Sequence, residues 1–178
     1  FHHEYRSGRM KSLSEDEEVA MAKLIEAKLL RAGLRRYEVS NYAQSGRHSR
    51  HNVNYWRYGD YLGLGAGAHS YKMTSAKESS GRRWSNEKNP GRYMTQINQA
   101  NHTVVEREEI NLDKAAGEFM FLGLRMTEGI SIDAFRARFD KSPREVFPQI
   151  SHWINGELLE ENGDFLQVAQ RTFRSRPN

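Results

Sequence analysis

The sequence predicts a mixed α+β fold, and three features of its pattern support that prediction. A helical pattern over about 15–32 leads directly into a short apolar–polar alternation at 34–40, as in one half of a helix–strand repeat. The stretch 72–90 is polar and typical of a hairpin, and the chain then turns mainly helical and ends in a β-ribbon. We expect a first domain of residues 1–110 and a second of residues 111–178.

The first helix has recognisable ends. Ser14 and Glu17 have the spacing of a capping box, in which each side chain binds the other residue's backbone N–H. Gly33 suits the position just past the helix, where a left-handed backbone is common. The strand predicted at 34–40 follows immediately.

A second strand is predicted at 61–65, because the apolar residues there are interrupted only by glycines that allow close approach of a ligand or backbone. Loops that follow strands in parallel α/β folds gather at one end and hold ligands. We therefore expect one shared pocket for the polar residues of the two loops. These are Asn41, His48, His51 and His69.

The remaining elements follow from caps, periodicity and turns. Trp84 is expected to pair with Tyr71 across the hairpin, and Pro90 to open a short helix. Beyond residue 111, three helices and two strands around an Asn-Gly turn suggest a winged-helix-like unit. The expected segments are 112–124, 131–139 capped by Ser131, 143–155, and the ribbon 158–166.

Composition limits the function. The chain has 178 residues, no cysteine and a net charge of +4. Disulfides and an iron–sulfur cluster held by this chain alone are therefore excluded, and no apolar run reaches the length of a membrane span. Residues 1–110 hold 18 Lys/Arg against 13 Asp/Glu, which suits anionic ligands as well as a solvated basic surface. The absence of cysteine fits a cytoplasmic protein.

The segment around His51 has the chemistry of a ligand site. The neutral imidazole of His51 could ligate haem iron or another metal, and nearby arginines could bind propionate carboxylates in bidentate fashion. Those arginines are Arg47, Arg50 and Arg57. A structural role remains open, in which His51 and Asn52 brace a loop. A metal site on His48 and His51 lacks obvious third and fourth ligands.

Two further patterns allow other functions. Residues 63–68 match G-x-G-x-x-A, but no clear helix follows, so a dinucleotide site is disfavoured. A winged helix could bind nucleic acid through the segment 143–155. Residues 111–178 have a net charge of −1, however, and a phosphate-binding surface should be basic.

Five segments together resemble one family. Residues 37–43 (YEVSNYA), 50–56 (RHNVNYW) and 60–70 (DYLGLGAGAHS) closely resemble the HemW/HemN group of radical S-adenosylmethionine proteins, which includes oxygen-independent coproporphyrinogen III oxidase. Residues 118–130 (EFMFLGLRMTEGI) and 153–159 (WINGELL) resemble that family's C-terminal domain. The similarity covers nearly the whole chain.

The resemblance implies a fold and a site. It implies the last βα elements of a partial TIM-like radical S-adenosylmethionine barrel, an antiparallel hairpin and a winged-helix-like C-terminal domain. The His-Asn-x-x-Tyr motif, associated with haem binding in the chaperone group, falls on His51, Asn52 and Tyr55. Gly65 and Ala66 correspond to a strand end near the S-adenosylmethionine pocket.

The resemblance also implies cofactors that this chain cannot hold alone. The family binds a [4Fe–4S] cluster through three cysteines, and none is present. We therefore expect the C-terminal fragment of a radical S-adenosylmethionine haem chaperone, inactive by itself, and not a nucleic-acid-binding protein. Its expected partners are haem or porphyrin and haem-acceptor proteins, and an open barrel edge would favour self-association. The alternatives are a fragment of an oxygen-independent coproporphyrinogen III oxidase and a winged-helix nucleic-acid-binding module.

Overall fold

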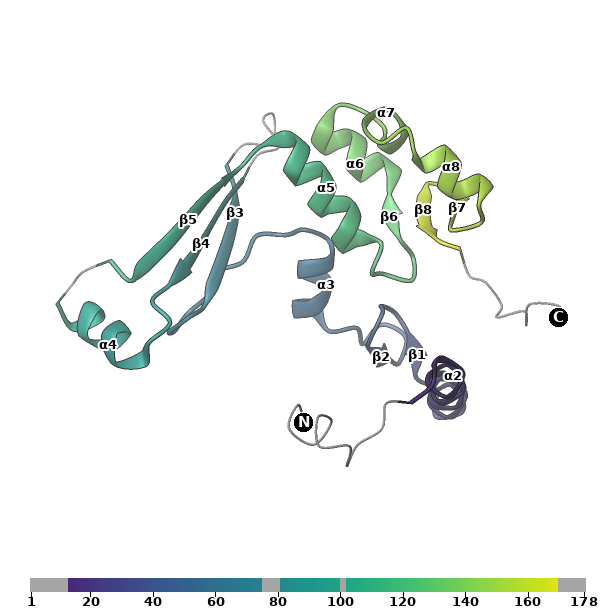
Figure 1. The fold of residues 1–178 in the computed structure, drawn as a ribbon, viewed down its shortest axis with the longest axis horizontal. Coiled ribbons are helices and arrows are strands. Elements are labelled where there is room, and N and C mark those ends of the chain that lie inside the picture. The colour runs from purple at the N-terminus through teal and green to yellow at the C-terminus, as the bar shows by residue number, and fades with distance from the viewer. Residues whose placement is uncertain (1–12, 75–80, 100–101, 170–178) are drawn as a thin grey trace. The chain divides into compact units, whose positions relative to one another are not determined.

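The structure is a computed structural model that describes residues 13–74, 81–99 and 102–169. It confirms a mixed helix-and-sheet protein (Figure 1). The chain divides into two compact units, residues 1–48 and residues 49–178. All strand pairs in the described ranges are antiparallel. None of the described helices is long and apolar enough to cross a membrane.

The first unit holds α2 (Glu15–Arg31) and the two-stranded sheet of β1 (Arg35–Arg36) and β2 (Tyr42–Ala43). The capping box of Ser14 is present as predicted. The strand predicted at 34–40 is wrong in length, because the chain turns back after Arg36. The buried Glu38 accepts the backbone N–H of Ser40 at 3.0 Å and so favours the turn over an extended strand.

In the second unit, β3 (His69–Met73), β4 (Gly81–Asn86) and β5 (Val104–Ile110) form one sheet in sequence order. The hairpin is confirmed, but the predicted pair of Tyr71 and Trp84 is wrong. Trp84 lies opposite Ser70, and Tyr71 lies opposite Arg83. This one-residue difference in register decides which side chains share a face, so Tyr71 and Arg83 lie on the same side.

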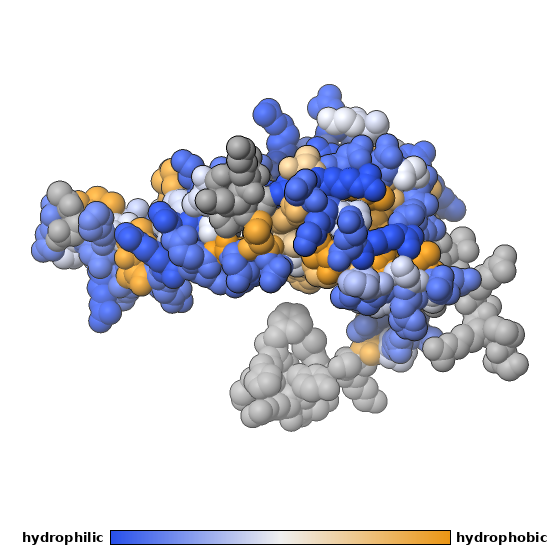
Figure 2. Space-filling view, turned by 90° about the horizontal axis from the view of Figure 1, so that it is seen from above, coloured by the Kyte–Doolittle hydropathy of each residue, from blue (hydrophilic) through white to orange (hydrophobic). Residues whose placement is uncertain are grey.

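Helix α4 (Pro90–Asn98) connects β4 to β5 and has the predicted proline at its start. It lies at the end of the sheet that points away from α5 (Leu112–Gly123) (Figure 1). Met94 and Ile97 on this helix are exposed, and hydrophobic side chains are visible at that end of the molecule in Figure 2.

The strand predicted at 61–65 is wrong. Only Tyr61 is bridged, to Tyr71, and the next apolar residues, Leu62 and Leu64, are 70% and 83% exposed. Gly65 and Gly67 have φ angles of 103° and 70°, so the backbone turns instead of extending. The alternation of glycine and apolar residues here belongs to a loop.

The C-terminal elements agree closely with the prediction, apart from the third helix. That segment divides into α7 (Pro143–Val146) and α8 (Ile150–Asn155), because Pro148 lies where a continuous helix would need an N–H donor. Phe135, fully buried, is at the centre of the apolar core. The other elements are β6 (Ile130–Ser131), α6 (Ile132–Phe139) capped by Ser131, β7 (Leu159–Asn162) and β8 (Phe165–Val168).

Candidate functional site

Helix α3 (Arg50–Trp56) presents the predicted histidine. Ser49 caps it by accepting the backbone N–H of Asn52 at 3.3 Å. His51 and Tyr55 are four residues apart and therefore lie on one face of the helix. Their rings meet edge to face, with centroids 4.8 Å apart and planes at 86°. The imidazole of His51 is exposed.

A pocket of 360 Å³ lies next to this histidine, since Tyr55 forms part of its wall. Its walls come from α3, the turn after α3, the sheet and α5, so they bring together parts of the second unit that are distant in sequence. Five aromatic rings and a single charged group line it. The lining residues are Tyr55, Trp56, Tyr58, Gly59, Tyr61, Tyr71, Arg83 and Leu122.

The backbone after α3 places one of these rings. Tyr58 has a φ of 56°, the left-handed region that bulky residues rarely adopt. Its ring lies 4.7 Å from that of Tyr71, and its hydroxyl donates to Glu118 at 2.8 Å. Strained residues of this kind persist where the surroundings hold them, and often at functional sites.

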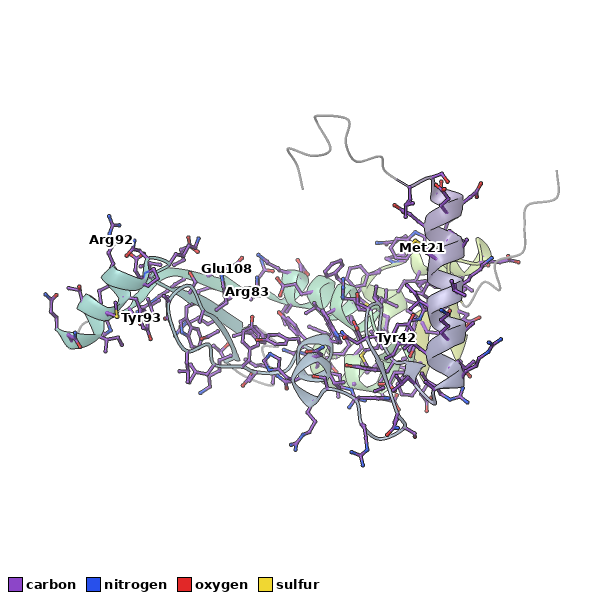
Figure 3. All side chains as sticks on the ribbon, turned by 90° about the horizontal axis from the view of Figure 1, so that it is seen from below. Met21, Tyr42, Arg83, Arg92, Tyr93 and Glu108 are labelled. Carbon is purple, nitrogen blue, oxygen red and sulfur yellow. The ribbon has the colours of Figure 1, made fainter. Side chains whose placement is uncertain are left out.

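Arg83 supplies the charge of the pocket. Its guanidinium donates to the carboxylate of Glu118 on α5 at 2.5 Å and to that of Glu108 on β5 at 3.3 Å. Figure 3 shows Arg83 and Glu108 beside one another on neighbouring strands. Glu108 is also paired with Lys114. The arginine is therefore held between two carboxylates, each of which has a second donor.

Burial and these contacts shift the pKa values of Tyr58, Arg83 and Glu108. Burial, followed by the hydrogen bonds to Tyr71 and Glu118, raises the pKa of Tyr58 far above its ordinary value, so its hydroxyl stays protonated. Desolvation opposes the charge of Arg83, but Glu118 and Glu108 outweigh it and raise the arginine's pKa. The hydrogen bond from Lys114 lowers the pKa of Glu108. The pocket thus keeps one cation beside the protonated hydroxyl of Tyr58.

A second arginine supports the floor of the pocket. Arg138 on α6 donates to the hydroxyl of Tyr71 at 2.9 Å and to the backbone carbonyl of Tyr58 at 3.2 Å. Its guanidinium also lies 4.5 Å from the centre of the Tyr58 ring, a distance typical of cation–π contact. These contacts fix both tyrosine rings.

The other residues singled out from the sequence lie in different surroundings. His48 stacks on Tyr37 in the first unit, with centroids 4.4 Å apart. His69 is exposed on β3 and does not line the pocket. Because Asn41 and His48 belong to the first unit and His51 and His69 to the second, their sharing of one pocket stays a prediction.

Of the predicted carboxylate-binding arginines, Arg50 and Arg57 belong to the second unit and do not line its pocket. Arg57 pairs with Glu128 at 2.8 Å, and Arg47 and Arg50 are exposed. Arg83 was not singled out from the sequence, because its neighbours in the chain give no sign of a pocket. Only the register of β4 against β3 and β5 brings it there.

The glycine loop packs against the sheet. The buried Asn86 donates its side-chain N–H to the carbonyl of Gly65 at 3.0 Å, and Gly63 donates its N–H to Ser70 at 2.9 Å. A side chain at Gly63 would meet the carbonyl of His69 at 2.1 Å. Gly65 and Ala66 do not line the 360 Å³ pocket. Within the described ranges, no cluster of three or more His, Asp or Glu residues could hold a metal ion.

The comparisons with known proteins point to one family. The family model for the HemN C-terminal domain matches residues 110–173. "Heme chaperone HemW" of Bacillus subtilis (strain 168) is 31% identical over 150 residues, which cover 84% of this chain and 38% of that protein. "Heme chaperone HemW" of Escherichia coli (strain K12) is 33% identical over 144 residues, covering 80% and 36%.

A solved structure shares the fold. Coproporphyrinogen III oxidase (HemN) from Escherichia coli, described there as a radical SAM enzyme, superposes with a TM-score of 0.64 at 13% identity, over 89% of this chain and 39% of that one. The chain thus spans less than half the length of the relatives it matches. It belongs to the HemW/HemN family and matches a C-terminal portion of it.

Proposed function

We propose that this chain is the haem-binding part of a radical S-adenosylmethionine haem chaperone, in which His51 ligates the haem iron. The observation that carries the proposal is the exposed imidazole of His51 against Tyr55, a wall residue of an aromatic pocket. Relatives at 31% and 33% identity that are called heme chaperones support it.

The other two residues of the motif have supporting roles in this proposal. Tyr55 holds the imidazole by its edge and would offer its ring to the macrocycle. The backbone N–H of Asn52 binds Ser49, which fixes the first turn of α3 and thereby the direction of His51.

The finer architecture belongs to the same proposal. Residues 1–110 would complete a partial barrel with its hairpin, and residues 111–178 would form a winged-helix-like domain. The helices α5, α6 and α8 beside the sheet β6–β8–β7 support the second assignment. Gly65 and Ala66 would lie near S-adenosylmethionine in the whole protein.

The iron–sulfur cluster of the family does not fit this chain's own residues. The chain has no cysteine to supply thiolates. We therefore assign to the chain haem binding and delivery to acceptor proteins in the cytoplasm, and no step of radical chemistry.

The first test is a titration of the 178-residue chain with ferric haem, followed at the Soret band. We expect His51→Ala to change the band and to weaken binding by about 10-fold or more, since even losing an outer partner of a metal ligand costs 10–100-fold. His69→Ala, another exposed histidine of the second unit, should leave both unchanged. Identical spectra for wild type and His51→Ala would rule out His51 as the ligand.

The alternative function is that of an oxygen-independent coproporphyrinogen III oxidase. The fold likeness to that enzyme supports it, but at 13% identity it concerns the fold alone. Decarboxylation of coproporphyrinogen III by the full-length, cluster-loaded protein under anaerobic conditions would favour it over the chaperone.

A further inference from the structure

The pocket beside His51 has features that a simple packing gap would lack. Its volume of 360 Å³ is at the small end of the range for ligand pockets, which suits one edge of a large planar ligand. The buried indole N–H of Trp56, a wall residue, has no hydrogen-bond partner among the described residues. A buried donor without a partner is costly, so the wall of the pocket is not fully satisfied as it stands.

The guanidinium of Arg83 can exchange its contacts with Glu118 and Glu108 for contacts with a ligand. The Arg83 side chain is 30% exposed, so a ligand can reach it. If Arg83 turned one edge of its guanidinium to a ligand, Glu118 would keep the hydroxyl of Tyr58 and Glu108 would keep Lys114. Neither carboxylate would be left without a partner, which keeps the cost of the exchange low.

We propose that Arg83 binds a carboxylate at the edge of the tetrapyrrole whose iron is held by His51, and so selects ligands that carry an acid group. Before the ligand arrives the guanidinium is paired with Glu118 and Glu108, and binding transfers one edge of it from these carboxylates to the ligand. Arginine suits this task because its planar fork matches a carboxylate with two parallel hydrogen bonds. The inference rests on the proposed function and adds to it the residue that recognises the ligand's negative charge.

The test uses two probes and one substitution. Ferric protoporphyrin IX and its dimethyl ester, which has no free carboxylate, are titrated into the 178-residue chain and into Arg83→Gln. We expect wild type to prefer the free acid by about 10-fold or more, as for loss of a charge-assisted hydrogen bond. Arg83→Gln should lose most of that preference, while its affinity for the ester stays close to that of wild type.

Matched controls separate this effect from general disruption. Arg82→Gln removes the neighbouring arginine, which is paired with Glu109 on the opposite face of the sheet, and should keep the preference. Arg83→Lys keeps the charge but not the fork, and should show an intermediate preference. His51→Ala should weaken both probes and still favour the free acid. Thermal unfolding of each variant reports whether the fold is retained.

The outcomes distinguish the two proposals. Wild type that binds both probes equally, or an Arg83→Gln variant that weakens both equally or neither, would overturn the role of Arg83 and leave haem binding intact. Wild type that binds neither probe would overturn the proposed function, and the role of Arg83 with it.

Discussion

Gly129→Ala should destabilise the second unit by roughly 2–5 kcal/mol, the combined effect of a left-handed backbone and overpacking. Gly129 precedes β6 and has a φ of 76°, which disfavours any residue with a Cβ. A Cβ there would lie 2.1 Å from the carbonyl oxygen of Leu166 and 2.7 Å from Gln167 Cα, both backbone atoms of β8. Backbone in a paired strand cannot move aside as a flexible side chain can.

The measurement is thermal or urea unfolding of the purified chain. A domain of this size loses about 2–4 °C of melting temperature per kcal/mol, so the midpoint should fall by several degrees or more. Gly163→Ala is the matched control. Its φ of 59° is also left-handed, but no atom lies within 4 Å of the added Cβ. If the two variants unfold at the same temperature, the contact of the added Cβ with β8 contributes nothing to the loss of stability.

The elements that the sequence predicted well are those whose ends are marked by local chemistry. Ser14 and Ser131 cap their helices with their own side chains, and Pro90 opens α4 where its missing N–H costs nothing. The ribbon of β7 and β8 turns at Gly163, next to Asn162. In each case the deciding interaction spans four residues or fewer, so it is visible in the sequence.

The elements that it missed depend on contacts between distant residues. The segment at 61–65 has the composition of a strand, but the sheet leaves it only one bridge, at Tyr61. The pairing of Tyr71 with Arg83 instead of Trp84 follows from the sheet register, which sequence periodicity does not fix.

The same limit applies to the candidate site. The motif of His51 and Tyr55 is local, since both residues lie on one short helix. Arg83 is 32 positions from His51 in the sequence and comes from another element. Its partner Glu118 lies on α5, a further 35 positions along. A motif search finds the histidine, whereas only the folded chain identifies the cation.

Phe135→Ala should cost about 3–5 kcal/mol, the usual range for removing a fully buried phenylalanine ring. Phe135 is 0% exposed, and its ring lies 4.5 Å from that of Phe139, 5.6 Å from that of Phe119 and 6.4 Å from that of Phe147. The cavity would open among rings contributed by α5, α6 and the residue that ends α7. The free energy of unfolding from urea titration measures the loss.

Phe121→Ala is the control, because this phenylalanine on α5 is 67% exposed and should change stability by less than about 0.5 kcal/mol. The effect of Phe135→Ala should also extend to the proposed haem site. Phe119 and Phe139 pack against both the C-terminal core and the cluster around Tyr58 and Tyr71. A change that loosens the packing of the core therefore also loosens the packing of that cluster. We therefore expect Phe135→Ala to weaken haem binding in proportion to the unfolded fraction. Full haem affinity in a variant whose C-terminal core has melted would show that the two clusters act independently.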